Sequence, residues 1–473
     1  MNIVSKVTCI VVAGAICCNY ATAQSKSTGV DILLNDLNPF KKAGKNWVVA
    51  SSANSDFNKP GDLTPVKGTG AVLNINSPKN NSQLVTNREF GDLELDLDFM
   101  MVKGSNSGVY LQGRYEIQLF DSWGKLNPTY SDCGGVYQRW DEKRTDHKGY
   151  EGIAPLTNAA KAPGLWQHLH LVFRAPKFDA SGQKTANARF EEVHLNGALV
   201  QDQVEVTGPT RSGMFEDEKS TGPLMFQGDH GKVAFKNIKY SIPQESAKQN
   251  QEGIANPILV NPVAKPYLLR SFMGYGDKKL THVISVGNPN QTNYSYDLSR
   301  GALIQFWRGR FVDATDMWFE RGEPYQWARP AGSLTILSDA PSIAVLVNSD
   351  TAWPDSIPFE AVKVKGYTLD ADRAPSFQYT VNGVNVSDKI TSPNATTLFR
   401  QITIENPSPN LKVRVLKADK IASAGKGRYI VNDKSYFIKL DEKVKPLIRQ
   451  SDGGQELIIP VEKASTVSYS IIW

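Results

Sequence analysis

The sequence predicts an all-β protein, and three observations lead to that fold class. The chain has 473 residues with 37 Gly, 26 Pro and 17 Tyr, a composition typical of short strands joined by turns. Its hydrophobic fraction of 40% excludes a disordered chain, and its length allows two or three domains with separate cores. Apolar and polar residues alternate in many short segments, which is the period of a strand with one buried face.

Charge and hydropathy argue against two further classes of protein. The formal net charge is only +5 and the basic residues are spread evenly, so we expect no nucleic-acid partner. Beyond the N-terminal region, no segment approaches the roughly 18 apolar residues of a membrane-spanning helix. The sequence therefore predicts no transmembrane segment.

The first 23 residues predict a signal peptide. Lys6 supplies a positive start, residues 7–18 form an apolar core too short to span a membrane, and a small-x-small cleavage site ends at Ala23. We therefore expect cleavage near Ala23 and a periplasmic or secreted protein.

The cysteines agree with that compartment. Three of the four lie in the signal segment, so only Cys133 remains and no internal disulfide can form. The fold must therefore depend on hydrophobic cores. Cys17 and Cys18 leave a lipoprotein as an alternative, which the large Ile16 before them disfavours.

The chain is expected to divide into a β domain at residues 24–242, a linker at 243–258 and a second β domain at 259–473. The linker segment is polar and has no apolar period. This organisation predicts a β-sandwich followed by a second domain of β-sandwich type.

Strand patterns recur through the first domain. Apolar residues alternate with acidic ones over 93–99, and further alternation follows over 109–119 and 169–173. Asn196 and Gly197 supply the positive φ angles of a tight hairpin turn. No convincing helix pattern occurs, so an antiparallel sandwich is the expected solution.

The second domain shows the same kind of pattern. Strands are expected at 303–307 and 343–347, and a second hairpin turn at Asn382 and Gly383. The chain is expected to end in a closing strand at 467–473.

One polar strand face in the first domain is the best candidate for chemistry. The usual motifs are missing: there is no Cys/His metal spacing, no phosphate-binding Gly loop and no nucleophile elbow. Within 109–119 the residues of opposite parity to the apolar ones are predicted to share one face. They are Tyr110, Gln112, Arg114, Glu116 and Gln118.

The run from Asn106 to Ser122 that contains this face resembles the 3-keto-disaccharide hydrolase family. These are secreted bacterial domains with a concanavalin-like jelly roll, often grouped loosely with family 16 glycoside hydrolases. Further segments match in the same order: residues 90–95, 133–137, 155–167, 173–179, 200–202 and 235–238. One departure is an extra Gly228 before Asp229 and His230, which shifts the loop that aims the histidine.

The resemblance implies a substrate whose glucose ring is already oxidised at C3. The ketone acidifies the proton on C2, so a base can remove it while the C1 substituent leaves by elimination. Addition of water then completes a net hydrolysis. Such a site needs a base near C2, a stabiliser for the enolate and an acid for the leaving oxygen.

Glu116 is our first choice for the base. Arg114, two residues away on the predicted face, is expected to hold Glu116 ionised or to stabilise the enolate. The alternative is a solvated ion pair on an outer face. His230 is the expected second proton carrier, because imidazole titrates near neutral pH. Substrate contacts are expected from Tyr110, Gln112, Gln118, Tyr137 and Gln227.

Metal ligands are less clearly marked. Five residues of straight strand, about 16 Å, separate Asp121 from Glu116, so Asp121 either holds a loop or binds metal. With Glu116 and Asp229 it would suit a hard cation such as Ca²⁺. His168 and His170 share a strand face as metal ligands or as exposed polar residues. The acidic stripe at Glu94, Asp96 and Asp98 is expected to face solvent.

The second domain resembles an unnamed β module of bacterial envelope proteins, some of which carry haem domains. Its signature lies in Arg270, Gly287, 293–297, 307–314, Trp318 and 321–322. No Cys-x-x-Cys-His occurs, so c-type haem attachment is not expected. The aromatic residues fit a glycan-binding surface or ordinary core packing equally well.

Three functions remain open at this point. The first is an envelope enzyme that cleaves 3-keto-glycosides, with an oxidised sugar as substrate and an oxidoreductase as supplier of it. The second is a non-catalytic carbohydrate-binding protein. The third, a conventional glycosidase, is weakened because no carboxylate pair shares the candidate strand face.

Overall fold

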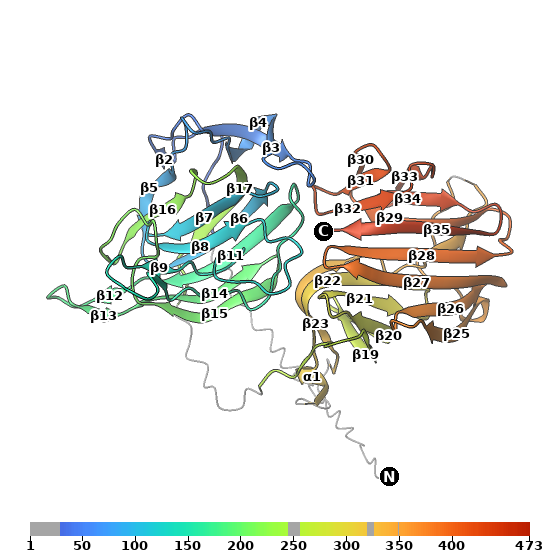
Figure 1. The fold of residues 1–473 in the computed structure, drawn as a ribbon. Coiled ribbons are helices and arrows are strands. Elements are labelled where there is room, and N and C mark those ends of the chain that lie inside the picture. Colours follow the sequence, from blue (N-terminus) through green and yellow to red (C-terminus); the bar gives the residue numbers. More distant parts are fainter. Residues whose placement is uncertain (1–28, 245–255, 319–325, 349) are drawn as a thin grey trace, which may run out of the picture.

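The computed structural model describes residues 29–244, 256–318, 326–348 and 350–473 (Figure 1). The predicted signal peptide and most of the predicted linker lie outside the described residues. Strands dominate, and the described helices are α1 (Thr315–Trp318) and the short η1 (Phe359–Ala361). The predicted all-β class is confirmed. No described helix is long and apolar enough to cross a membrane.

Two antiparallel sheets dominate the first part of the chain. The larger runs β15 (Ala198–Val206), β14 (Ala188–Leu195), β11 (Trp166–Arg174), β6 (Leu93–Met101), β17 (Val233–Ser241), β4 (Thr64–Asn74) and β3 (Trp47–Asn54), with β1 (Val30–Asp31) beside β17. The smaller runs β2 (Phe40–Lys41), β5 (Leu84–Phe90), β16 (Gly222–Phe226), β7 (Asn106–Leu111) and β8 (Tyr115–Phe120). Two short pairs complete this part: β9 (Arg139–Trp140) with β10 (Gly149–Tyr150), and β12 (Lys177–Phe178) with β13 (Lys184–Ala186).

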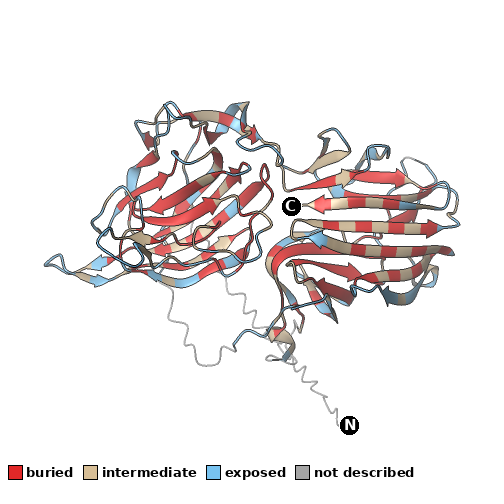
Figure 2. Ribbon diagram, viewed as in Figure 1, coloured by how far each residue is buried: buried red, intermediate tan, exposed pale blue. Residues whose placement is uncertain are grey.

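The inward faces of these sheets contribute to one hydrophobic cluster. Leu95 and Phe99 of β6 enter it from the larger sheet, and Ile117 of β8 and Phe226 of β16 from the smaller one. Figure 2 shows that most positions along the strands of this sandwich are buried. The opposite face of the smaller sheet is covered as well, since Tyr110, Glu116 and Met225 are each at most 2% exposed. This is the jelly-roll sandwich that the sequence predicted.

The second part of the chain builds three sheets of its own. One runs β18 (Leu259–Val260), β22 (Ala302–Asp313), β21 (Thr292–Asp297), β20 (Lys278–Gly287) and β19 (Tyr267–Tyr275), with β23 (Arg329–Ile336) beside β22. Another runs β25 (Val362–Leu369), β26 (Pro375–Val381), β27 (Val384–Asn394), β28 (Thr397–Glu405), β35 (Ser465–Ile472), β32 (Tyr436–Leu440), β31 (Arg428–Val431) and β30 (Ile421–Ser423). The third runs β24 (Ile343–Val345), β29 (Leu411–Ala418), β34 (Gly454–Pro460) and β33 (Leu447–Ser451).

Both predicted Asn-Gly hairpins are present. Asn196 and Gly197 have φ values of 51° and 79° between β14 and β15, and Asn382 and Gly383 have 48° and 81° between β26 and β27. An L residue without a short polar side chain is strained at such angles, which is why these two residue types mark the turns.

The two parts of the chain lie side by side (Figure 1), and side chains of one part contact the other. Trp123 Nε1 donates a hydrogen bond of 2.6 Å to the backbone oxygen of Trp473. The rings of Phe57 and Phe437 lie 5.4 Å apart, centroid to centroid. Gln291 also donates to a backbone oxygen in the loop that holds Trp123. The loop that follows β8 is thus fixed from outside its own sandwich.

Candidate functional site

The candidate site is built on a hairpin rather than on one straight strand. β7 ends at Leu111 and β8 begins at Tyr115, and Gln112 and Gly113 turn the chain with φ values of 55° and 65°. The predicted single polar face over this run is therefore wrong. The three-residue turn leaves the alternation of apolar residues unbroken, so the pattern concealed it.

Hairpin pairing nevertheless brings part of the predicted face together. Tyr110 lies directly opposite Glu116, and Gly108 directly opposite Gln118, on the face that points away from the core. A Cβ atom at Gly108 would lie 2.1 Å from Glu116 Oε1. Glycine at this position is what allows the Glu116 carboxylate to lie across the neighbouring strand. Met225 of β16 extends the same face beside Tyr110.

Glu116 is a buried carboxylate, with 2% of its surface exposed. Burial raises its pKa to about 8 because the charged form loses hydration, and the nearby charge of Asp229 acts in the same direction. A hydrogen bond from the Tyr110 hydroxyl opposes this shift. The predicted alternative of a solvated Arg–Glu pair is therefore wrong.

Tyrosines line the carboxylate. The Tyr110 hydroxyl lies between Glu116 and the backbone oxygen of Arg211, and burial and the Glu116 charge raise its pKa well above the ordinary range. Tyr137 N donates to Glu116 O at 3.1 Å, because the loop after β8 returns along the edge of that strand. Burial, followed by the Glu116 charge, also raises the pKa of Tyr137. Neither phenol will ionise near neutral pH.

Arg114 does not face Glu116. Its Nη2 lies 2.6 Å from Asp217 Oδ1, its Nη1 donates to the Gln112 backbone oxygen, and its guanidinium lies 4.4 Å from the ring centre of Phe215. The predicted same-face placement is a consequence of treating the run as one strand. Arg114 instead ties the hairpin turn to the loop before β16.

Gln112 also belongs to the turn and not to the predicted face. Its Nε2 donates to the backbone oxygens of Phe90 and Ser220. Gln118 lies on the face as predicted, where its amide donates to Asn106 Oδ1 at 2.9 Å. Its remaining predicted role, substrate contact, stays a prediction.

Gln227 follows β16 and lies beside Gly108. Its backbone N donates to the Gly108 oxygen at 2.9 Å, and its own backbone oxygen accepts from Ser107 Oγ. The side-chain Oε1 is buried and has no hydrogen-bond partner among the described residues. An amide oxygen in that state is available to a ligand hydroxyl.

Asp229 and His230 lie at the more open end of this face. His230 Nδ1 lies 2.7 Å from Asp229 Oδ1, and the two side chains are 50% and 33% exposed. Asp229 is close enough to Glu116 for its charge to act on that carboxyl. The structure thus places a histidine–carboxylate pair near the buried base, and the proton-carrying role of His230 stays a prediction.

Sequence reasoning missed two residues here. Thr210 accepts a hydrogen bond from Glu116 N at 3.1 Å and donates one to Arg114 O, which holds the start of β8. Arg211 stacks on Trp140 at 3.8 Å, and its charge acts on Tyr137. Both lie in a loop without apolar period, where no pattern in a single sequence indicates proximity.

Of the predicted metal ligands, Asp229 lies at this face near Glu116, whereas Asp121 holds a loop. Asp121 Oδ2 accepts a hydrogen bond from Gly104 N at 2.8 Å, the loop-holding role that was one of its two predicted alternatives. The described residues that form a group of three with metal-binding potential are Glu94, Asp96 and His170, on the outer side of the larger sheet. The predicted solvent-facing acidic stripe is therefore wrong in part, because Asp96 is hydrogen-bonded to two histidines.

Comparison with known proteins concerns the first sandwich. A family model described as a 3-keto-alpha-glucoside-1,2-lyase-like domain matches residues 33–241, somewhat less than half of the chain. No curated protein matches the sequence.

Several solved structures resemble parts of the chain. A candidate glycosyl hydrolase from Parabacteroides distasonis is 20% identical, covering 46% of this chain and 84% of its own, with a TM-score of 0.30. A second from that organism is 22% identical, covering 42% and 99%, with a TM-score of 0.27. A carbohydrate-binding module from Bacillus subtilis is 13% identical, covering 43% and 100%, with a TM-score of 0.19.

The family match and the sequence motifs concern the same sandwich. Both the family match and the motifs include the β7–β8 hairpin, which carries the buried Glu116 carboxylate. Residues 33–241 of this chain thus match the model of the 3-keto-alpha-glucoside-1,2-lyase-like domain family, which the sequence resemblance also named.

Proposed function

We propose that the first domain cleaves the glycosidic bond of 3-keto-glycosides or 3-keto-disaccharides, with Glu116 as the base that removes the C2 proton. The observation that carries this proposal is the state of Glu116. Burial raises its pKa to about 8, close to the pH at which a secreted enzyme works. A carboxylate in water would be a much weaker base.

The reaction balances with the groups that are present. Glu116 takes the proton from C2, the electron pair of that C–H bond forms the C1–C2 double bond, and the C1–oxygen bond breaks. The leaving oxygen receives a proton, and the product has a C1–C2 double bond conjugated with the C3 ketone. Addition of one water across the double bond gives the 3-keto sugar, so the sum is hydrolysis.

The remaining roles fall to residues around the carboxylate. Arg211 replaces Arg114 as the candidate cation for the enolate oxygen, because its charge acts on Tyr137 beside Glu116, whereas Arg114 is bound to Asp217. His230 is the candidate acid for the leaving oxygen. The unpartnered Oε1 of Gln227 is the candidate acceptor for a sugar hydroxyl.

A second candidate function is carbohydrate binding without cleavage. It is favoured by one observation, the 2% exposure of Glu116, since a base must come within hydrogen-bond distance of C2. The partly exposed Asp229 and His230 would then line a sugar-binding edge.

The test follows aglycone release from a 3-keto-glucoside and from the parent glucoside. Release from the keto substrate alone supports the proposal, and release from the parent alone supports a conventional glycosidase. Binding of the keto sugar without release leaves only the second candidate. Arg211→Gln, with Arg114→Gln as its matched control, then separates enolate stabilisation from support of the turn: Arg211→Gln is expected to lower kcat more.

The cellular setting is part of the proposal. The N-terminal pattern supports a periplasmic or secreted location. The substrate chemistry requires an oxidoreductase that oxidises C3 of the sugar first, so we expect such an enzyme to act before this one.

A further inference from the structure

A cluster of histidines and carboxylates lies on the outer face of the larger sheet, on the side away from the core. Three adjacent strands supply it: β6 with its acidic residues, β11 with His168 and His170, and β14 with Glu192 and His194. His170 lies directly opposite Asp96 on one side and His194 on the other. Half of the six histidines in the chain therefore meet in one place.

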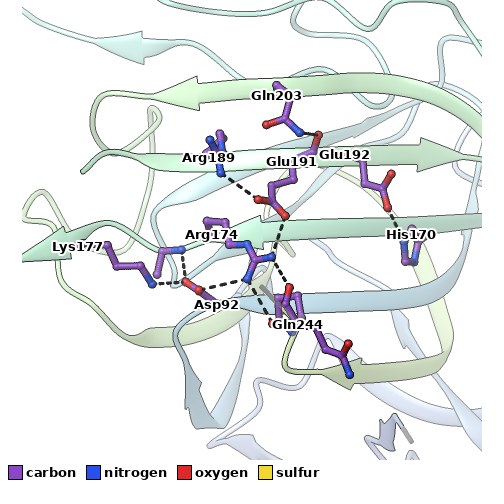
Figure 3. Close-up of polar contacts among 11 residues, drawn as sticks. Asp92, His170, Arg174, Lys177, Arg189, Glu191, Glu192, Gln203 and Gln244 are labelled. Carbon is purple, nitrogen blue, oxygen red and sulfur yellow. Dashed lines mark hydrogen bonds and ion pairs between the residues drawn. The ribbon is translucent and has the colours of Figure 1, made fainter. Parts of the chain in front are cut away.

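The contacts within this cluster are short and centred on His170. Its Nδ1 lies 3.0 Å from Asp96 Oδ1, and its Nε2 lies 3.6 Å from Glu192 Oε1. Figure 3 shows His170 and Glu192 pointing toward each other from neighbouring strands. His168 approaches the same Asp96 Oδ1 through its Nε2 at 3.3 Å. Its Nδ1 lies 2.9 Å from Asp98 Oδ1.

The neighbouring part of the same face is built differently. There Asp92 lies between Lys177 and Arg174, and Glu191 between Arg174 and Arg189 (Figure 3). These cations keep their charge at any physiological pH, so the carboxylates are permanently matched. The carboxylates in the histidine cluster instead face imidazoles, which, unlike guanidinium and ammonium groups, can exchange a proton for a metal ion.

Neutral imidazoles in the histidine cluster would have more carboxylate contacts than hydrogens to donate. Both ring nitrogens of His168 and of His170 face carboxylate oxygens, which can only accept while ionised. A neutral imidazole donates from one nitrogen only, so one contact of each ring lacks a hydrogen. A second proton fills this place in the metal-free protein, and a metal ion bound to one ring nitrogen can take it.

We propose that Glu94, Asp96 and His170 bind one divalent transition-metal ion of the zinc class. Their ligand atoms all lie within 4.8 Å of one another. Bonds of about 2.0–2.2 Å to Zn²⁺ place two tetrahedral ligands about 3.3 Å apart, and the Asp96–His170 contact is already 3.0 Å. An imidazole with two carboxylates and open positions suits zinc and its neighbours better than Ca²⁺ or Mg²⁺.

The groups around these three residues fit the second layer of a metal site. Metal-bound histidines usually donate their other N–H to a carboxylate, and Glu192 faces His170 Nε2 in that way. Ser241 Oγ donates to Glu94 Oε2 at 2.7 Å, and His168 contacts the same oxygen of Asp96 as His170 does. Each ligand is thus held by a neighbour on another strand.

The experiment is a Zn²⁺ titration of the full chain by calorimetry, after chelator treatment and at neutral pH. We expect one ion per chain, with affinity at least 100-fold weaker in His170→Gln. In Glu192→Gln we expect a 10- to 100-fold loss, the size found for second-layer carboxylates. His147→Gln is the matched control, because His147 is exposed in a loop outside the cluster.

Three results would overturn the proposal: no Zn²⁺ binding by the wild type, equal binding by His170→Gln, or Ca²⁺ binding as tight as that of Zn²⁺. Glu94→Gln provides a second variant if His170→Gln fails to fold, which its unfolding curve would show. The readout is metal binding and not sugar cleavage, so the outcome is independent of the proposed function.

Discussion

The two outer faces of the first sandwich shift the pKa of a carboxyl group in opposite directions. On the smaller sheet, Glu116 is buried without a cation beside it, and burial raises its pKa to about 8. On the larger sheet, burial alone would also raise the pKa of Asp96. Hydrogen bonds from His168 and His170 hold it well below the usual range. The partners, more than the depth, decide the charge of a carboxylate in this domain.

The histidines respond in the opposite direction to their acidic neighbours. Hydrogen bonds that His168 donates to Asp96 and Asp98 raise its pKa to about 9, and those that His170 donates to Asp96 and Glu192 raise its pKa to about 10. In the absence of metal, the histidines and carboxylates of this face are therefore charged at neutral pH. Glu116 on the smaller sheet instead keeps its proton to a higher pH than an ordinary carboxyl group.

The largest effect is expected on turnover, when the Glu116 carboxylate is removed. Glu116→Gln keeps the size of the side chain and removes the base, so turnover of a 3-keto-glucoside should fall by roughly 10²–10⁴. Substrate affinity should change little, because the amide can still bond to a hydroxyl. The measurement is steady-state kinetics on matched folded samples. Activity within about tenfold of the wild type would move the role of base to His230.

The second effect concerns the pH dependence of catalysis. A base must be ionised to act, so kcat/KM should rise about tenfold per pH unit below the Glu116 pKa of about 8 and level off above it. The check is a pH–rate profile of the wild type. A profile that is flat between 6.5 and 8 would contradict the assignment of Glu116 as the base.

The third effect concerns stability. Between 4.5 and about 8 the unfolded chain releases the Glu116 proton while the folded chain keeps it, so wild-type stability should fall with rising pH. Glu116→Gln should lack this contribution. The unfolding free energy of the variant minus that of the wild type should increase by up to about 1.4 kcal/mol per pH unit in that window. Parallel pH dependence of the two proteins would show that Glu116 is not held protonated.

The smallest effect tests the matched charges of the larger sheet. The Arg174 side chain is 13% exposed and bonds to Asp92, Glu191 and two backbone oxygens. Arg174→Gln should lower the free energy of unfolding by about 1–3 kcal/mol. Lys177→Gln is the control: its side chain is 55% exposed, so a loss within about 1 kcal/mol is expected. Denaturant unfolding would measure both, and equal losses would contradict the difference.

The fold was largely predictable because its signals are local. Alternation over 93–99 placed β6, and two Asn-Gly pairs placed two hairpins, since strand period and turn angles depend on neighbours in sequence. The β7–β8 turn was missed because Gln112 adopts a positive φ that rarely marks a turn, while the apolar alternation continued through it.

The candidate site was predictable only in part for the same reason. Tyr110 and Glu116 were placed on one face, although they meet across a hairpin. Arg114 was misplaced, because its partner Asp217 lies about a hundred residues away and no local pattern reports that contact. The burial of Glu116 depends on how a whole sheet face is covered, which a strand pattern does not contain.

The contact between the two parts of the chain has a consequence for solubility. Ala162 and Leu165 of the first sandwich lie within the hydrophobic cluster of the second part, and Phe57 and Trp123 pack against it. A first sandwich produced by itself would present these side chains to water as one apolar patch. Such patches drive self-association, so a shortened protein would be expected to aggregate or to pair through this surface before its chemistry could be assayed.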